Sequence, residues 1–265
     1  MKVYFVLITL TVFMSISFAQ NKKSNELPSK WYLYETNNYD LYFTPSDSTD
    51  LSKYMAYFDN AQESIEKYFN NKFLTKYDIY VHPNRKSLDL QFSSEWNIPG
   101  FKSECWMVAS GVADQFNLLS TRVWDTESCE QNPVVASAIQ QLITHEVMHV
   151  YHGQINLDHF FENMADMSWF IEGVAVMVSG QLDSEKMSKV KQIIKEDRYP
   201  RLLNKLWNGD DRYGICGSLV NYIRGRYGVE KISEILKAQS NEQLLKLLKI
   251  SERELIDSWA ESIIK

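Results

Sequence analysis

The spacing of apolar residues changes about halfway along the chain. Before residue 132, apolar residues form short runs rich in aromatic and β-branched side chains, which predict strands. The runs lie at residues 31–34, 39–43, 77–81, 107–113 and 116–120. Between the second and third runs, Leu51 to Phe69 has apolar residues at helical spacing, with Asp50 in the N-cap position. Residues 31–132 therefore predict an N-terminal α/β half, a mixed sheet with one or two helices.

Residues 133–265 predict a helical half. Pro133, favoured at a first helical position, begins a helix expected over 134–151, with Gly153 as its stop. Further helices are predicted at 167–178, 182–195 and 213–227, and after capping boxes that begin at Ser240 and Ser251. The two halves together predict an α+β fold class.

The first residues predict a secretory signal peptide. A basic start at Lys2 precedes a short apolar run, and small residues then place a cleavage site after Ala19. Residues 1–19 are thus expected to be a signal peptide and 20–30 a flexible lead-in, which predicts a secreted or periplasmic protein. The alternative is an uncleaved anchor, although the run is short for a spanning helix. No membrane span is expected after signal removal.

Composition narrows the choice of partners. The chain has 28 Lys and Arg against 34 Asp and Glu, a formal net charge of -6. An acidic chain without basic clusters lacks the electrostatic footprint of a nucleic-acid-binding protein and of one that binds anionic membranes. The oligomeric state is left open by the sequence.

Three cysteines follow the predicted signal peptide. In an exported protein one pair of them can be oxidised. Cys105 and Cys129 lie in neighbouring loop-like segments and are the favoured pair, whereas Cys216 lies in a predicted helix and is expected to be buried.

The predicted helix over 134–151 carries the pattern His-Glu-x-x-His. His145 and His149 are four residues apart, so they lie on one helix face and can bind one zinc ion. Glu146 is placed to take a proton from a water at the metal without being a ligand. The alternative is that His145 and His149 are buried, hydrogen-bonded core histidines. This alternative must explain two His and a Glu in a mostly apolar helix, where polar groups are costly to bury without a partner.

A catalytic zinc ion needs a third protein ligand and an open position for water. Glu172 is the favoured ligand, because it is the single carboxylate in an otherwise apolar predicted helix and needs a compensating charge. Its alternative role is an exposed or ion-paired residue at the helix start. Other candidates lie on the connection after the motif: Asp158, His159, Glu162 and Asp166.

These motifs resemble the gluzincin zinc metallopeptidases, in particular the peptidase MA-like group. The resemblance rests on His145-Glu146-x-x-His149, Trp169-Phe170-x-Glu172-Gly173-x-Ala175, Tyr213-Gly214, Tyr227-Gly228 and Trp259. It implies a thermolysin-like zincin fold with an N-terminal mixed sheet, an active-site helix and a helical C-terminal subdomain. It also implies that the 107–119 region pairs with an extended substrate. Tyr213 matches a Tyr that stabilises the oxyanion in the related group, and the alternative for it is an aromatic packed at a helix start.

The sequence departs from the family pattern in two places. Relatives carry a carboxylate four residues after the glutamate ligand, where this chain has Val176, so support for a zinc histidine must come from elsewhere. The Gly-x-Met-Glu-Asn motif of aminopeptidases is absent. The stretch around Asp211 and Tyr213 also resembles aspzincins, which makes Asp158 a rival third ligand.

The sequence therefore predicts an exported zinc metallopeptidase with Zn²⁺ as cofactor and a peptide or protein as substrate. The metal ligands are expected to be His145, His149 and Glu172, and the catalytic residues Glu146 and Tyr213. One alternative is a non-catalytic metallopeptidase-like binding or scaffold module. Another is a zinc hydrolase that acts on a non-peptide amide.

Overall fold

The computed structural model describes residues 3–8, 30–129 and 135–265. They divide into two compact units, each built from three stretches of chain. The first consists of Met1–Ala56, Lys76–Ser110 and Gln115–Ile139, and the second of Tyr57–Thr75, Gly111–Asp114 and Gln140–Lys265. No helix in the described ranges is both long and apolar enough to cross a membrane.

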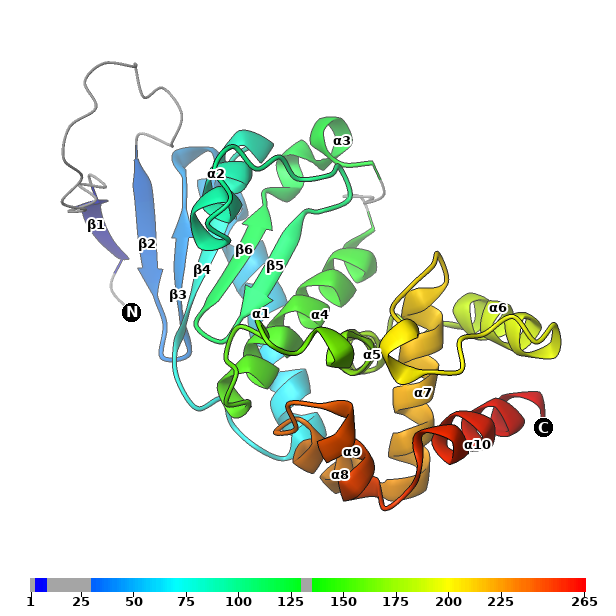
Figure 1. Ribbon diagram of the computed structural model, residues 1–265. Coiled ribbons are helices and arrows are strands. Elements are labelled where there is room, and N and C mark those ends of the chain that lie inside the picture. The colour runs from blue at the N-terminus through cyan, green and yellow to red at the C-terminus, as the bar shows by residue number, and fades with distance from the viewer. Residues whose placement is uncertain (1–2, 9–29, 130–134) are drawn as a thin grey trace. The chain divides into compact units, whose positions relative to one another are not determined.

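The β-structure is a mixed sheet in the order β1-β2-β3-β4-β6-β5 (Figure 1). The strands are β1 (Val3–Ile8), β2 (Trp31–Glu35), β3 (Tyr39–Phe43), β4 (Tyr77–His82), β5 (Ala109–Val112) and β6 (Gln115–Leu119). The β1-β2 and β2-β3 pairs are antiparallel, whereas β4 lies parallel to β3 and to β6. β5 is an edge strand of the sheet.

The longest α-helices of the described chain are α4, with 20 residues, and α1, with 19. They are α1 (Leu51–Phe69), α2 (Arg85–Glu95), α3 (Trp124–Glu127), α4 (Ala136–Ile155), α5 (Ser168–Val178), α6 (Ser184–Lys195), α7 (Arg212–Tyr227), α8 (Val229–Ile235), α9 (Asn241–Leu248) and α10 (Glu252–Ile264). Four have the side-chain N-caps typical of helix starts, with Asn84 before α2, Asp183 before α6, Ser240 before α9 and Ser251 before α10.

In the first unit, buried side chains alternate with partly exposed ones along β3 and along most of β4. Leu41 on β3, Ile79 on β4 and Phe116 on β6 are fully buried, as expected for strands covered on at least one face. α2 lies over this part of the sheet (Figure 1). Beneath α2, the buried His82 contacts Ser87 Oγ through Nδ1 at 2.9 Å and Asn117 Oδ1 through Nε2 at 3.2 Å.

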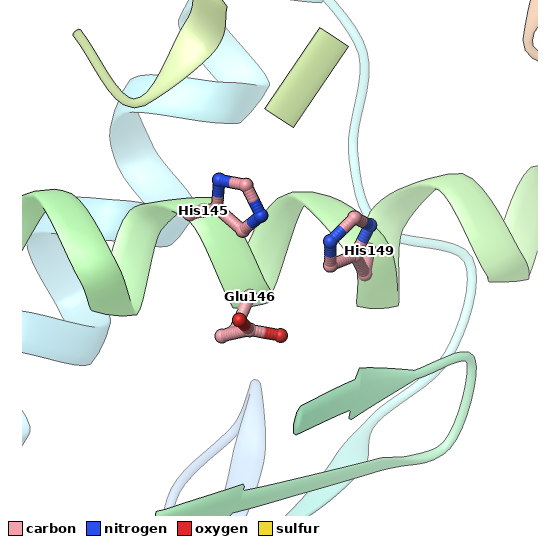
Figure 2. A group of neighbouring side chains, drawn as sticks. All are labelled: His145, Glu146 and His149. Atoms are coloured by element: carbon pink, nitrogen blue, oxygen red, sulfur yellow. The ribbon is translucent and has the colours of Figure 1, made fainter. Parts of the chain in front are cut away.

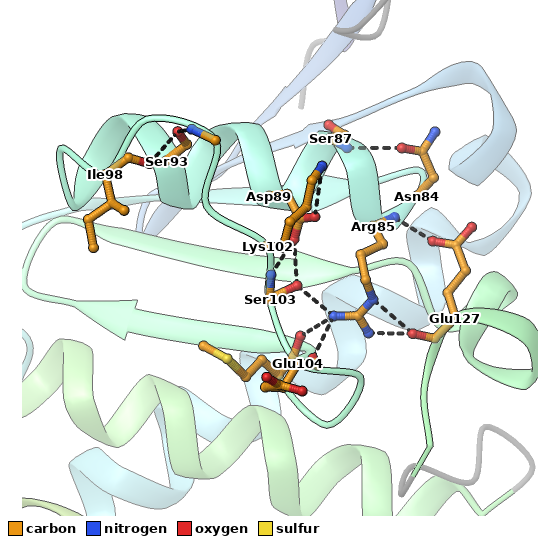
Figure 3. Close-up of polar contacts among 12 residues, drawn as sticks. Asn84, Arg85, Ser87, Asp89, Ser93, Ile98, Lys102, Ser103, Glu104 and Glu127 are labelled. Carbon is orange, nitrogen blue, oxygen red and sulfur yellow. Dashed lines mark hydrogen bonds and ion pairs between the residues drawn. The ribbon is translucent and has the colours of Figure 1, made fainter.

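Arg85, at the start of α2, organises the long connection before β5 (Figure 3). Its guanidinium donates to Ser103 Oγ at 2.8 Å and to the carbonyls of Glu104 and Met107 at 3.0 and 2.8 Å. The same group donates to the carbonyls of Cys105 and Glu127. One side chain thus satisfies several carbonyls of a segment that lacks regular structure.

The Cys105–Cys129 disulfide joins two segments that Arg85 also contacts. Cys216 is a free, buried cysteine in α7. Both findings agree with the sequence-based expectation for the three cysteines.

The mixed α and β content confirms the predicted α+β class. Several predicted boundaries are wrong. Gly153 does not end α4, which continues to Ile155. A side chain at Gly153 would meet the His159 carbonyl oxygen at 2.7 Å, so this glycine allows a close approach of two backbones within the second unit. The strand predicted from Met107 begins at Ala109.

Part of the predicted N-terminal organisation falls on residues that the structure does not describe. The cleavage site after Ala19 and the predicted helix start at Pro133 lie outside the described residues. Within the predicted signal peptide, Val3–Ile8 form β1 and pair with β2.

Candidate metal centre

The candidate metal centre is built on two turns of α4. The His145 and His149 rings lie on neighbouring turns, and Glu146 projects from a different side of the helix (Figure 2). The ring centroids of the two histidines are 4.9 Å apart. One potential ligand atom from each of His145, Glu146 and His149 lies within 4.8 Å of the others, so the group can hold a metal ion. Both histidines are buried.

Glu172 on α5 approaches the same point. Its Oε2 lies 3.2 Å from His145 Nε2 and 3.8 Å from His149 Nε2. Tetrahedral coordination at roughly 2.0–2.1 Å would place ligand atoms about 3.3 Å apart. Two imidazole nitrogens and one carboxylate oxygen therefore converge at a spacing that suits the coordination of one metal ion.

The position of Glu172 depends on close packing of α5 against α7. A Cβ at Gly173 would lie 2.6 Å from the carbonyl oxygen of Cys216, so only glycine allows this approach. The residues around Glu172 on α5, including Phe170 and Val174, are fully buried. The apolar helix is therefore fixed in the second unit, and its single carboxylate is directed at the two histidines.

Glu146 lies where the backbones of α4 and β5 touch. A Cβ at Gly111 would be 2.2 Å from the Glu146 carbonyl oxygen. Burial raises the pKa of the Glu146 carboxyl to about 7, and the Glu172 charge adds to this effect. His145 and a hydrogen bond from the Gly111 backbone N–H act in the opposite direction. Such a carboxyl can both accept and release a proton near neutral pH.

The pKa values of the two histidines are shifted in opposite directions. Burial lowers the pKa of His149 to about 4, so its imidazole is neutral at pH 7. Burial also acts to lower the pKa of His145, but the hydrogen bond to Glu172 and the charge of Glu146 outweigh it, and the pKa is raised. Metal binding needs neutral imidazoles, so a metal ion would compete with a proton for His145.

Each histidine also has a second ring nitrogen. His145 Nδ1 lies 2.8 Å from the side-chain oxygen Oε1 of Gln181. His149 Nδ1 is buried and has no hydrogen-bond partner among the described residues. Gln181 was not a sequence-based candidate. The only local signal was Ser179-Gly180, which predicts a helix end but not where the next side chain points.

Tyr213 lies at the start of α7, near His145. The centroids of the two rings are 6.3 Å apart. Burial raises the pKa of Tyr213 to about 12, and the Glu172 and Glu146 charges add to the effect. The phenol is therefore neutral at pH 7 and can donate a hydrogen bond.

The rival ligand candidates have other partners. Asp158 accepts hydrogen bonds from the backbone N–H groups of Glu162 and Asn163, which closes a turn after α4. Asp166 accepts from the backbone of Asn241, and His159 Nδ1 lies 2.7 Å from the Gly153 carbonyl oxygen. Glu162 is exposed. The metal-binding group found among the described residues consists of His145, Glu146 and His149, so it contains none of these rivals and does not contain Glu172.

No protein-family model matches the chain, and no curated protein matches its sequence. The His-Glu-x-x-His motif in α4 is consistent with a zincin.

Proposed function

We propose that the chain is an exported zinc metallopeptidase of the gluzincin, peptidase MA-like kind, with a thermolysin-like fold. The observation that carries the proposal is the approach of Glu172 Oε2 to the Nε2 atoms of both motif histidines, with Glu146 beside them. A structural zinc site needs no buried carboxyl that can exchange a proton, whereas a hydrolytic site does.

Three residues would hold zinc: His145, His149 and Glu172. Zinc in this position supplies an acidified water and a polarised scissile carbonyl. Glu146 accepts the proton of the attacking water and later delivers it to the leaving amine. A pKa near 7 suits a group that must do both.

Tyr213 donates a hydrogen bond to the oxyanion that develops on the scissile carbonyl. The proximity of its ring to His145 and its neutral phenol support this role. The export part of the proposal rests on the apolar N-terminal run and on the small residues Ser17 and Ala19 before the expected cleavage site.

The substitution Glu146→Gln tests the proposal. The variant should keep zinc, because Glu146 is not a ligand, and should lose hydrolysis of a broad peptide library by at least about a hundredfold, the usual contribution of a general base. Zinc content and cleavage products are measured on the same preparation. Glu162→Gln, the same chemical change at an exposed position, is the matched control and should retain parental activity.

Two results would contradict the proposal. Parental turnover by Glu146→Gln would remove its assigned role. Stoichiometric zinc without cleavage of any peptide by the parent chain would instead favour a non-catalytic module or a non-peptide substrate.

A further inference from the structure

We propose that Gln181 is the positioning residue for His145: its amide oxygen fixes the imidazole in the tautomer that presents Nε2 to the metal. The inference rests on the proposed zinc site and adds a residue that the motif does not contain.

The contact defines which nitrogen carries hydrogen. The Gln181 Oε1 atom can only accept, so at 2.8 Å the His145 Nδ1–H must donate to it. With the proton on Nδ1, the neutral ring has its lone pair on Nε2, the atom that faces Glu172 Oε2. Gln181 thus contacts one nitrogen of the His145 ring, and Glu172 lies beside the other nitrogen.

The helix cap of α5 delivers Gln181 to this position. After α5, the Gly180 N–H donates to the Met177 carbonyl at 3.4 Å and the Gln181 N–H donates to the Val176 carbonyl at 3.1 Å. Gly180 has φ +75, the left-handed conformation that such a cap requires. Glu172 therefore comes from the middle of α5, and Gln181 follows just beyond the end of the same helix.

α4 holds the cap in place. Gln141, one turn before His145, donates from Nε2 to the Gly180 carbonyl oxygen at 3.0 Å. Residues four apart lie on the same side of a helix, so Gln141 and His145 contact consecutive residues of the cap, Gly180 and Gln181. Because α4 contacts the cap at both Gly180 and Gln181, the Gln181 amide is held more firmly than it would be by the contact with His145 alone.

The packing of Val176 explains why no carboxylate at this position supports a histidine of the proposed zinc site. Val176 is fully buried, and a Cβ added to Gly217 of α7 would lie 2.7 Å from its Cγ1. The residue faces α7, where a carboxylate would be desolvated without a partner. The side chain of Gln181, in the cap after α5, contacts His145 instead.

The test measures zinc affinity of the full mature chain by competition with a chromophoric chelator. Gln181→Met keeps the length of the side chain but removes the acceptor, and it should weaken zinc binding about 10- to 100-fold, the usual effect of losing such a partner. Gln181→Glu keeps an acceptor and should stay within a few-fold of the parent. Gln192→Met, at an exposed position of α6, is the matched control and should bind zinc like the parent. The visible spectrum of the cobalt(II)-substituted chain gives a second readout, and Gln181→Met should change it while Gln192→Met should not.

Parental zinc affinity in Gln181→Met would overturn the inference. Equal weakening in Gln181→Met and Gln181→Glu would also overturn it, because the acceptor would then not be what matters. In both cases a parent chain that binds zinc and cleaves peptides leaves the proposed function intact. A parent chain that binds no zinc would overturn the proposed function and this inference together.

Discussion

At the scale of single residues, the candidate centre combines side chains from two turns of α4 with Glu172 of α5 and Gln181 beyond the end of α5. His145, Glu146 and His149 are predicted from spacing alone, since α-helical geometry fixes their mutual positions. Glu172 was predicted for another reason, as a carboxylate in an apolar helix that needs a positive partner. Gln181 was not predictable, because its approach to His145 depends on a cap and on packing between helices. Nor does the sequence predict that His149 Nδ1 is buried without a hydrogen-bond partner among the described residues.

A buried histidine in the first unit predicts a pH dependence of stability. Burial lowers the pKa of His82 to about 4 from its ordinary 6.5, although the bond to Asn117 acts in the opposite direction. The unfolded chain therefore binds the proton first as pH falls, so this residue's contribution to stability is lost from about pH 6.5 down to about 4. The effect should reach at most about 1.4 kcal/mol per pH unit.

The variant His82→Gln cannot titrate and should show a shallower dependence of the free energy of unfolding on pH over that window. Urea unfolding at a series of pH values measures the slope for both chains. Parallel slopes for parent and variant would contradict the assignment of a neutral, buried His82.

At the scale of elements, helices and strands were easier to predict than the contacts between them. The apolar pattern predicted α4, α5 and α7 within a few residues of their observed ends. Gly153 was misread as a helix stop, because in sequence a glycine at a helix end looks the same as a glycine that allows close packing. Gly173 is of the second kind: it lies beside Glu172 and allows α5 to approach α7.

Gly173→Ala should therefore disturb both stability and the metal centre. Its Cβ would meet backbone and side-chain atoms of Cys216 and Val220 at 2.6–2.9 Å, so the two helices must separate. We expect a loss of about 1–3 kcal/mol in the free energy of unfolding, as in overpacked cores, together with weaker zinc binding.

Gly225→Ala is the matched control for that change. Gly225 is an exposed residue of α7, and an added Cβ has nothing within 4 Å. The substitution should stabilise the helix by roughly 0.5–1 kcal/mol and leave zinc affinity unchanged. Equal stability changes in Gly173→Ala and Gly225→Ala would refute the close-packing account of α5 and α7.

At the scale of the whole molecule, composition and pattern predicted the α+β class but not the strand order. The parallel pairing of β4 with β6 passes over β5 and so joins strands that are not consecutive, and no local signal in the sequence encodes it. The Arg85 cluster was also not predicted, because its partners lie 18 to 42 residues away in sequence. The Cys105–Cys129 pair was favoured from loop position, and the disulfide agrees with it.

The most direct test of the central claim is a metal analysis of the purified mature chain and of its Glu172→Ala variant. Elemental analysis after exhaustive dialysis should find one zinc ion per parent chain and clearly less than one per variant chain, because the variant loses one of three protein ligands. A variant that retains full zinc stoichiometry and parental affinity, or a parent chain that binds none, would contradict the account.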